Sequence, residues 1–243
     1  RHPVTRMNRF FTEDIAGGEA RITGEDVRHI TRVLRLAAGD RIAVCDGHGT
    51  EYDAAILRAS ESEVVCSLSA ARRSESEPVH AVTLFQGLPK AGKMETIVQK
   101  CVELGAVAIV PTLCSRCVAL PTRDYEKKRQ RYQRVALEAA KQSRRGVIPE
   151  VYGVQTLEQI DVRAFDTALV AYEDERGTTL KQALRQGVGK RIALIVGPEG
   201  GFEEGEIAFL LRAGAVPVSL GRRILRTETA GMAMLAQVLY ELE

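Results

Sequence analysis

The C-terminal two-thirds of the chain contains short, continuous apolar runs separated by longer amphipathic segments. The runs lie at residues 107–110, 167–171, 192–196 and 215–218. Runs of this kind are typical of strands that are covered on both faces, which occur almost only in parallel sheets flanked by helices. Apolar side chains also recur at helical spacing from Met94 to Val102 and from Tyr125 to Ala140. This alternation predicts an α/β domain built on a parallel sheet.

The N-terminal part follows a different pattern. Short apolar segments at 41–45, 51–57 and 63–68 alternate with turns rich in Gly, Asp and Ser, which predicts a small β-barrel. Residues 25–36 are the exception, because their apolar spacing predicts one short helix with a basic side. The polar stretch 70–78 ends in proline and is expected to be a linker. We therefore expect one domain over residues 1–73 and a second over 79–243.

The charge of the chain is nearly balanced, with 34 basic and 32 acidic side chains, but it is not evenly distributed. Residues 123–145 hold nine basic groups against three acidic ones. This local excess favours a helix that binds RNA phosphates, and a merely solvated helix face is the alternative. A near-neutral total therefore does not exclude nucleic acid as a partner.

Several other classes of protein are disfavoured. No apolar run approaches the roughly 20 residues of a membrane span, and the basic start has no apolar segment behind it, so we expect a cytoplasmic protein without a membrane partner. Five cysteines, an odd number, favour reduced thiols over a disulfide framework. Cys114 and Cys117 have no second pair of cysteines or histidines nearby in the sequence, so we expect no metal site.

A glycine-rich segment, Gly-Pro-Glu-Gly-Gly-Phe, begins at Gly197, where the run 192–196 ends. Ligands of open α/β sheets bind outside the carboxyl ends of the strands, and glycines there let a ligand approach the backbone. The alternative is a tight turn whose glutamates complement the dipole of the next helix. Since the segment contains neither a P-loop nor a Gly-x-Gly-x-x-Gly pattern, nucleoside triphosphates and nicotinamide cofactors are disfavoured.

A second polar segment occupies residues 220–230 and precedes a helix that we expect over Gly231 to Leu242. Arg226, Thr227 and Glu228 stand at the start of this helix, where free backbone amides gather polar ligands. Helix capping by one of the threonines is the alternative. The helical spacing is expected to turn inward the apolar residues Met232, Leu235, Ala236 and Leu239.

The two segments in this order and spacing resemble the ribosomal RNA small subunit methyltransferase E family, which belongs to the SPOUT class. The pattern is Gly-Pro-Glu-Gly-Gly-Phe-x-x-x-Glu at 197–206 followed by Leu-Gly-x-Arg-Ile-Leu-Arg-Thr-Glu-Thr-Ala at 220–230. Further matches lie at residues 9–11, 29–40, 93–105, 111, 115–116 and 134–143, so the resemblance covers nearly the whole chain. It departs at Arg144, where the family pattern leads us to expect glycine.

The resemblance implies a PUA-like barrel that helps to hold RNA, followed by a SPOUT-type domain with a trefoil knot over about residues 192–243. It implies a homodimer that uses S-adenosylmethionine to methylate N3 of one uridine in the 16S rRNA of the small ribosomal subunit. The implied cofactor contacts are Ala171, Tyr172, Gly197, Pro198, Glu199, Gly200, Gly201, Leu220, Gly221, Ile224, Leu225, Arg226, Thr227 and Thr229. The expected RNA contacts are Arg9, His29, Arg32, Arg35, Lys93, Lys100, Arg116, Arg134, Gln142 and Arg145.

The implied chemistry needs two kinds of side chain. N3 of uridine carries a proton at neutral pH, so methyl transfer requires removal of that proton and stabilisation of the negative charge that develops. We expect Arg226 to stabilise the uracil oxygens and either Glu228 or Glu199 to accept the proton. Each glutamate can equally orient Arg226 or bind the cofactor ribose, so the base stays open.

Two alternatives remain for the chain as a whole. The first is a knotted methyltransferase that acts on tRNA or on a ribose hydroxyl. The second is a noncatalytic RNA-binding assembly factor that uses the barrel, which is disfavoured because both cofactor segments are complete.

Overall fold

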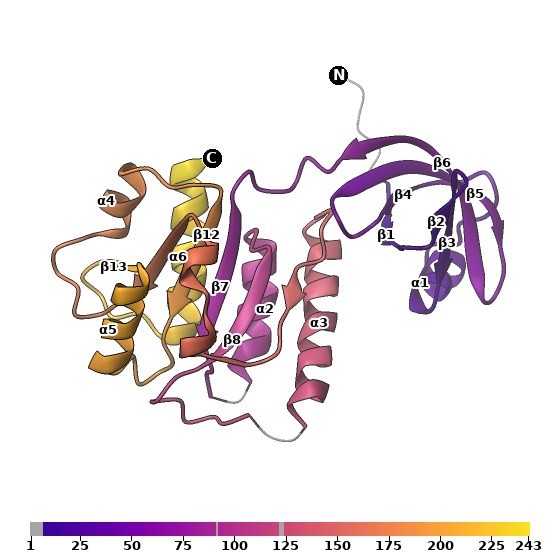
Figure 1. Ribbon diagram of the computed structural model, residues 1–243. Coiled ribbons are helices and arrows are strands. Elements are labelled where there is room, and N and C mark those ends of the chain that lie inside the picture. The colour runs from indigo at the N-terminus through magenta and orange to yellow at the C-terminus, as the bar shows by residue number, and fades with distance from the viewer. Residues whose placement is uncertain (1–6, 91, 122–123) are drawn as a thin grey trace. The chain divides into compact units, whose positions relative to one another are not determined.

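The computed structural model describes residues 7–90, 92–121 and 124–243 (Figure 1). The described chain divides into two compact units, with a boundary between Glu77 and Pro78. The first unit also contains residues 140–148, and the second contains 78–139 and 149–243. Residues 1–6 of the expected first domain and Arg123 of the basic segment lie outside the described residues.

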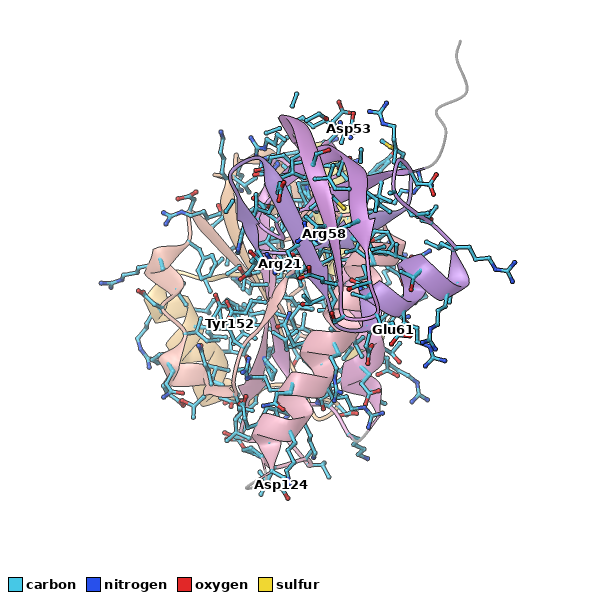
Figure 2. The ribbon with its side chains drawn as sticks, turned by 90° about the vertical axis from the view of Figure 1, so that its right-hand side faces the viewer. Arg21, Asp53, Arg58, Glu61, Asp124 and Tyr152 are labelled. Carbon is cyan, nitrogen blue, oxygen red and sulfur yellow. The ribbon has the colours of Figure 1, made fainter. Side chains whose placement is uncertain are left out.

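The first unit is a six-stranded sheet whose strands follow the order β1-β4-β5-β6-β3-β2. The strands are β1 (Arg9–Phe11), β2 (Ile15–Ala16), β3 (Glu19–Thr23), β4 (Arg41–Cys45), β5 (Thr50–Ala59) and β6 (Glu63–Arg73). All neighbours are antiparallel except β1 and β4. Alternate side chains of β3, Ala20 and Ile22, enter the core, while Arg21 stays outside and pairs with Glu63 at 2.8 Å (Figure 2). This period of two is the pattern of a strand with one buried face.

Two sequence-based expectations for this unit are wrong in detail. The helix expected over 25–36 is shorter, because α1 (Glu25–Arg28) continues as a π-helical turn only to Val33, and Arg35 adopts a left-handed conformation with φ 56°. The linker expected from residue 70 begins later, because β6 runs to Arg73. Arg72 holds that end of the strand by pairing with Glu51 at 2.6 Å and with Asp53 at 2.8 Å.

The second unit contains a parallel sheet in the order β10-β8-β7-β12-β11-β13, with β9 beside β8. Its strands are β7 (Ala81–Gly87), β8 (Ala108–Leu113), β9 (Glu150–Val151), β10 (Gln155–Thr156), β11 (Thr167–Ala171), β12 (Arg191–Val196) and β13 (Val216–Val218). Every pairing is parallel, which confirms the α/β domain predicted from the apolar runs.

Helices cover both faces of this sheet (Figure 1). They are α2 (Lys93–Glu103), α3 (Tyr125–Gln142), α4 (Leu180–Arg185), α5 (Glu204–Ala213) and α6 (Thr227–Leu242), with short turns η2 (Leu157–Gln159) and η3 (Val162–Ala164). Ala193 and Ile195 of β12 pack in one core with Ile207 and Leu210 of α5. On the opposite face α6 packs against β7, β12 and α2. None of the helices in the described ranges combines the length and the apolar character that a membrane crossing requires.

Helix α6 begins four residues earlier than expected and turns a different stripe toward the sheet. Its buried residues are Thr227, Ala230, Gly231, Met234, Leu235 and Val238. Leu235 is therefore buried as expected, whereas Met232, Ala236 and Leu239 are only half-buried. Gly231 explains the rotation, because a Cβ atom at this position would lie 2.9 Å from Gln86 Oε1 of β7. The close approach of α6 to the sheet therefore occurs at Gly231.

Candidate active site

The segments expected to bind a ligand meet at the carboxyl edge of the second sheet. β12, β11 and β13 are parallel neighbours that end at Val196, Ala171 and Val218. The backbone N–H of Tyr172 donates to the carbonyl of Val218 over 3.1 Å, which joins the ends of two of these strands. A Cβ atom added to Gly201 would lie 3.3 Å from Glu173 Oε1, so the loop after β12 also approaches the loop after β11.

A buried hydrogen-bond chain connects the two polar segments. The Thr227 hydroxyl donates to the carbonyl of Gly197 over 2.6 Å and accepts from Gln86 Nε2 over 2.8 Å. Both Thr227 and Gln86 are buried. The side chain of Thr227 therefore fastens the start of α6 to the glycine-rich loop.

The glycine-rich loop lies directly against the end of β7. A Cβ atom added to Gly87 would come within 2.4 Å of the backbone nitrogen of Pro198, a distance that real Cβ atoms do not reach. Gly200 is similarly close to Arg116, because an added Cβ would lie 2.9 Å from Arg116 Cβ. These glycines are therefore required by contacts within the protein.

The glutamates after the loop act as a helix cap, in addition to the complement to the helix dipole that the sequence led us to expect. Glu203 and Glu206 form a capping box at the start of α5. Glu206 Oε2 accepts from the backbone N–H of Glu203 over 2.8 Å, and Oε1 accepts from that of Ser115 over 2.7 Å. Because Glu206 is buried, this carboxylate fixes the loop after β8 beside the loop after β12.

Two of the three expected catalytic side chains share one lysine. Lys93 Nζ lies 2.9 Å from Glu199 Oε1 and 3.0 Å from Glu228 Oε2. The backbone N–H of Lys90 also donates to Glu199, over 3.1 Å to Oε1. Although burial opposes ionisation of Glu199, its bonds to Lys93 and Lys90 hold its pKa below the ordinary value. The pKa of Glu228 is also lowered, first by its own backbone N–H and then by Lys93.

Arg226, the third expected catalytic residue, is exposed at the start of α6. Its positive charge contributes to the lowered pKa of Glu228. Within the described part of the chain, no hydrogen bond or ion pair fixes the Arg226 guanidinium. It is therefore available to a ligand at this edge of the sheet.

The loop before α6 is exposed and carries apolar side chains. Gly221 has a φ of 121°, and a Cβ atom added there would meet nothing within 4 Å. Ile224 is 84% exposed, while Leu220, Leu225 and Tyr172 are half-buried. Apolar side chains beside free backbone groups are the usual lining of a small-molecule site.

The expected RNA contacts of the first unit are only partly available. His29, Arg32 and Arg35 are exposed, although Arg32 lies 3.4 Å from the Glu61 carboxylate. Arg9 is half-buried, pairs with Glu51 at 2.7 Å and also donates to the carbonyl of Arg144. The Arg9 guanidinium is thus engaged within the unit.

Arg145 cannot contact a phosphate in this structure, contrary to expectation. It is 2% exposed and its Nη2 lies 2.7 Å from the Glu77 carboxylate. Arg134 and Gln142, by contrast, are exposed. The charge excess of the basic segment is reduced by two acidic side chains from outside it, through the pairs Arg131–Glu95 and Lys141–Asp26, and Arg129 pairs with Glu126 inside it.

The remaining expected RNA contacts lie around α2 and the loop after β8. Lys100 pairs with Glu103 at 2.9 Å, and Lys93 is held by two glutamates. Arg116 is exposed and donates to the carbonyl of Gly200 over 3.1 Å, so it borders the glycine-rich loop. Of these three, Arg116 combines exposure with proximity to the candidate site.

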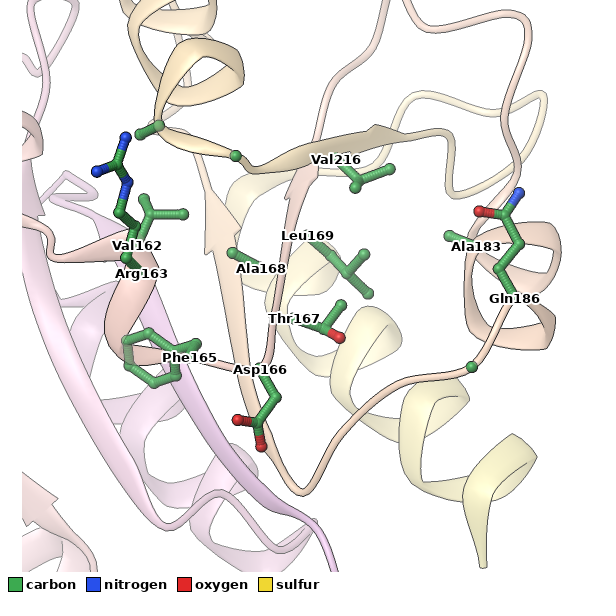
Figure 3. Close-up of a pocket in the computed structure, with 13 residues that line it drawn as sticks. Val162, Arg163, Phe165, Asp166, Thr167, Ala168, Leu169, Ala183, Gln186 and Val216 are labelled. Atoms are coloured by element: carbon green, nitrogen blue, oxygen red, sulfur yellow. The ribbon is translucent and has the colours of Figure 1, made fainter.

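A hollow of about 410 Å³ in the second unit lies elsewhere (Figure 3). Its lining includes Asp166 and Thr167 at the start of β11, Gln186 after α4 and Gly214 after α5. These residues mark the amino edge of the sheet, opposite the two polar segments. Since ligands of open α/β sheets bind at the carboxyl edge, we do not include this hollow in the active site.

The five cysteines are free thiols. Cys114 and Cys117 lie in one turn, in which the N–H of Cys117 donates to the carbonyl of Cys114 over 3.0 Å. The hydrogen bond from the Cys114 thiol lowers the pKa of Cys117 to about 7. Over the described ranges, His, Cys, Asp and Glu side chains nowhere gather in a group of three that suits a metal ion.

Sequence reasoning missed two side chains that organise the site. Gln86 belongs to no motif, because it simply follows the apolar residues of β7. Only its position at the carboxyl end of that strand could have identified it as a candidate. Glu206 belonged to the resemblance but was interpreted only as a complement to the helix dipole. Its contact with Ser115 joins residues 91 positions apart, which no local pattern reveals.

Comparison with known proteins agrees with this arrangement. A family described as RNA methyltransferase domain matches residues 75–239, and one described as RNA methyltransferase PUA domain matches residues 22–69. The ribosomal RNA small subunit methyltransferase E of Bacillus subtilis (strain 168) is 37% identical over 230 residues, which cover 91% of this chain and 90% of the relative. The chain belongs to the ribosomal RNA small subunit methyltransferase E family.

Solved structures support the same assignment. The methyltransferase E of Neisseria gonorrhoeae, bound to S-adenosyl methionine, is 28% identical and has a TM-score of 0.83, covering 97% of this chain and 98% of its own. A putative methyltransferase from Legionella pneumophila, in complex with the cofactor SAM, is also 28% identical with a TM-score of 0.83, and 98% of each chain is covered. The methyltransferase E fold thus extends over both units.

Proposed function

We propose that this chain transfers a methyl group from S-adenosylmethionine to N3 of one uridine in 16S rRNA of the small ribosomal subunit, in the cytoplasm. The observation that carries the proposal is the carboxyl edge of the second sheet, where Thr227 bonds to Gly197 and Lys93 links Glu199 to Glu228. This edge lies in the part of the chain that matches the RNA methyltransferase domain.

The residues at this edge fit S-adenosylmethionine. The apolar walls at Leu220, Ile224 and Leu225, together with the open space at Gly221, suit the adenine ring. Arg226 and the free N–H groups at the start of α6 suit the carboxylate of the methionine moiety. The cofactor supplies an electrophilic methyl group on a sulfonium sulfur, so the reaction itself requires no metal ion.

The protein must take a proton from N3 and stabilise the anionic uracil that results. Glu199 is engaged by Lys93 Nζ and by the Lys90 backbone, so both of its oxygens accept hydrogen bonds. Glu228 has Lys93 on Oε2 and is therefore the better placed proton acceptor. Arg226, exposed and close in sequence, stabilises the uracil oxygens through charged hydrogen bonds.

RNA is held, in this proposal, by exposed basic groups on both units. His29, Arg32 and Arg35 in the first unit, and Arg116 and Arg134 outside it, are exposed. Residues 22–69 of the first unit match the PUA domain of RNA methyltransferases. We propose that this PUA-like sheet closes into a barrel and positions the rRNA by its phosphates.

The second unit forms a trefoil knot and a homodimer in this proposal. After β13 the chain returns to the loop that follows β12, where Thr227 bonds to Gly197, and α6 then packs on β7 and β12. This path supports threading of the C-terminal segment. Met232, Ala236 and Leu239 of α6 are half-buried and Tyr240 is 88% exposed, which supports pairing with a second copy through this helix. Sedimentation should give twice the chain mass.

The test uses small ribosomal subunits from a strain that lacks this gene. Purified protein and S-adenosylmethionine are added, and the 16S rRNA nucleosides are analysed by mass spectrometry. We expect one 3-methyluridine per particle with the wild-type protein, none with Arg226→Ala, and the wild-type amount with Arg212→Ala, a control at an exposed arginine of α5. A methylated ribose, a methylated tRNA, or an unmodified rRNA would each contradict the proposal.

A further inference from the structure

One ammonium group holds together two carboxylates that come from different loops. Lys93 is the first residue of α2, Glu199 lies in the loop after β12, and Glu228 lies in the first turn of α6. Since the ammonium lies 2.9 Å from one carboxylate oxygen and 3.0 Å from the other, the two oxygens are at most about 6 Å apart. Without a cation between them, carboxylates this close disfavour each other's ionisation.

The three side chains are shielded from solvent to a similar degree. The exposed fraction of the side chain is 26% for Lys93 and 23% for each glutamate. The Lys93–Glu228 contact is an ion pair whose geometry departs from that of a hydrogen bond, and Glu228 Oε2 is buried. Charge, more than directed hydrogen bonding, therefore ties Glu228 to Lys93.

We propose that Lys93 is a positioning residue for methyl transfer, whose ammonium keeps Glu199 and Glu228 side by side as carboxylates so that Glu228 can accept the uracil proton. The catalytic meaning of this inference rests on the proposed function. The contact also engages Lys93 within the protein. Lys93 is therefore not the phosphate contact that the sequence led us to expect.

The other charged groups around the pair do not replace Lys93. Glu199 accepts additionally from the backbone N–H of Lys90. Glu228 is influenced by Arg226 of its own segment. Glu95, the next charged side chain of α2, pairs with Arg131 of α3 at 2.9 Å. Lys93 is thus the cation that both glutamates share, and its contacts with Glu199 and then Glu228 raise its own pKa, so it stays protonated.

The first experiment is an NMR titration of the glutamate side-chain carboxyl carbons in the free full-length protein. Glu199→Gln and Glu228→Gln assign the two signals. In Lys93→Met, which preserves the length of the side chain, we expect the pKa of at least one of the two glutamates to rise by about 1 or more. Lys93→Arg should restore the wild-type titration. Lys181→Met removes an exposed lysine of α4 that lies near Glu241 of α6, and it should leave the titration of both glutamates unchanged. Unchanged titration in Lys93→Met overturns the proposal.

The second experiment measures single-turnover methylation of small subunits against pH. In Lys93→Met the acidic limb of the profile should move to higher pH by the same amount, while RNA affinity stays at the wild-type value. A loss of RNA affinity with an unmoved acidic limb overturns the proposal and makes Lys93 a phosphate contact. Should the wild-type protein methylate no RNA although the NMR titration moves as expected, the proposed function fails, whereas the role of Lys93 in keeping both carboxylates ionised is upheld.

Discussion

Arg145 and Glu77 form a buried ion pair between residues that are 68 positions apart. Arg145 Nη2 lies 2.7 Å from Glu77 Oε2, and the exposed fractions of the two side chains are 3% and 9%. Glu77 Oε1 also accepts from the backbone N–H groups of Gly146 and Val147, over 2.8 and 3.1 Å. The Glu77 carboxylate therefore ties together the two stretches of the first unit, the one that ends at residue 77 and the one that follows α3. Both partners of the ion pair are shielded from water.

Removing one partner of this pair should destabilise the first unit strongly. We expect Arg145→Met to lower the free energy of unfolding by about 3–5 kcal/mol, because Glu77 is then a buried charge without its partner. The double variant Arg145→Met/Glu77→Met should lose less than Arg145→Met alone, since no charge is left buried. Urea denaturation measures both. Equal stability of Arg145→Met and the wild type would show that the pair is solvated.

Arg144 is the departure from the family pattern, and its backbone explains why glycine is expected there. Its φ is 61°, the left-handed region that favours glycine, at the turn that ends α3. Its carbonyl accepts from the Ser76 hydroxyl over 2.7 Å, a bond that a glycine keeps. Arg144→Gly should therefore raise the free energy of unfolding by about 0.5–1 kcal/mol.

The matched control for Arg144→Gly is Lys128→Gly, at an exposed position inside α3. There the glycine enters a regular helix, and stability should fall by about 1 kcal/mol. Thermal or urea unfolding of the two variants separates a conformational effect from a general effect of glycine. A loss of stability in both would contradict the strain at Arg144.

The sequence was most informative where burial is continuous along the chain. Strands β11 and β12 are continuously apolar, because residues of both pack in one core with α5 while α6 packs on the other face of β12, so their boundaries were predictable to within one residue. The two polar segments were also placed correctly at the carboxyl edge, since that edge follows from the parallel sheet and the order of the strands.

The sequence was least informative about the partners of charged residues. A count of basic groups treats Arg134 and Arg145 alike, although one is exposed and the other is buried against Glu77. Lys93 looked like a phosphate ligand because its two carboxylates lie more than 100 residues away in the chain. The stripe of α6 was misjudged because Gly231, which carries no side chain, makes the close approach to the sheet.

Cys117 should be the most reactive of the cysteines in the folded protein near neutral pH. The Cys114 thiol lowers its pKa to about 7, whereas burial raises the pKa of Cys101 to about 12. The thiolate is the reactive form, so alkylation of Cys117 by iodoacetamide should rise from about pH 6 to pH 8 and then level off. Peptide mass spectrometry after timed alkylation measures this, with the unfolded protein as control. A rate that still increases steeply above about pH 8.5 would indicate an ordinary thiol.

Arg134 provides the sharpest test of RNA binding by α3, because the same helix offers a matched arginine. Arg134 is exposed, and no ion pair neutralises it among the residues that the structure describes. Arg129 is bound by Glu126 at 2.7 Å.

Arg134→Ala and Arg129→Ala each remove one positive charge, so they have the same effect on the net charge of the protein. Only a phosphate contact should lower the dependence of RNA affinity on salt, by about one phosphate in the logarithmic slope. We expect this for Arg134→Ala, and an unchanged slope for Arg129→Ala, in filter-binding titrations over a range of salt concentrations. Identical slopes for both variants and the wild type would mean that α3 faces solvent in the complex, and the RNA would then have to be held by His29, Arg32 and Arg35 of the first unit and by Arg116.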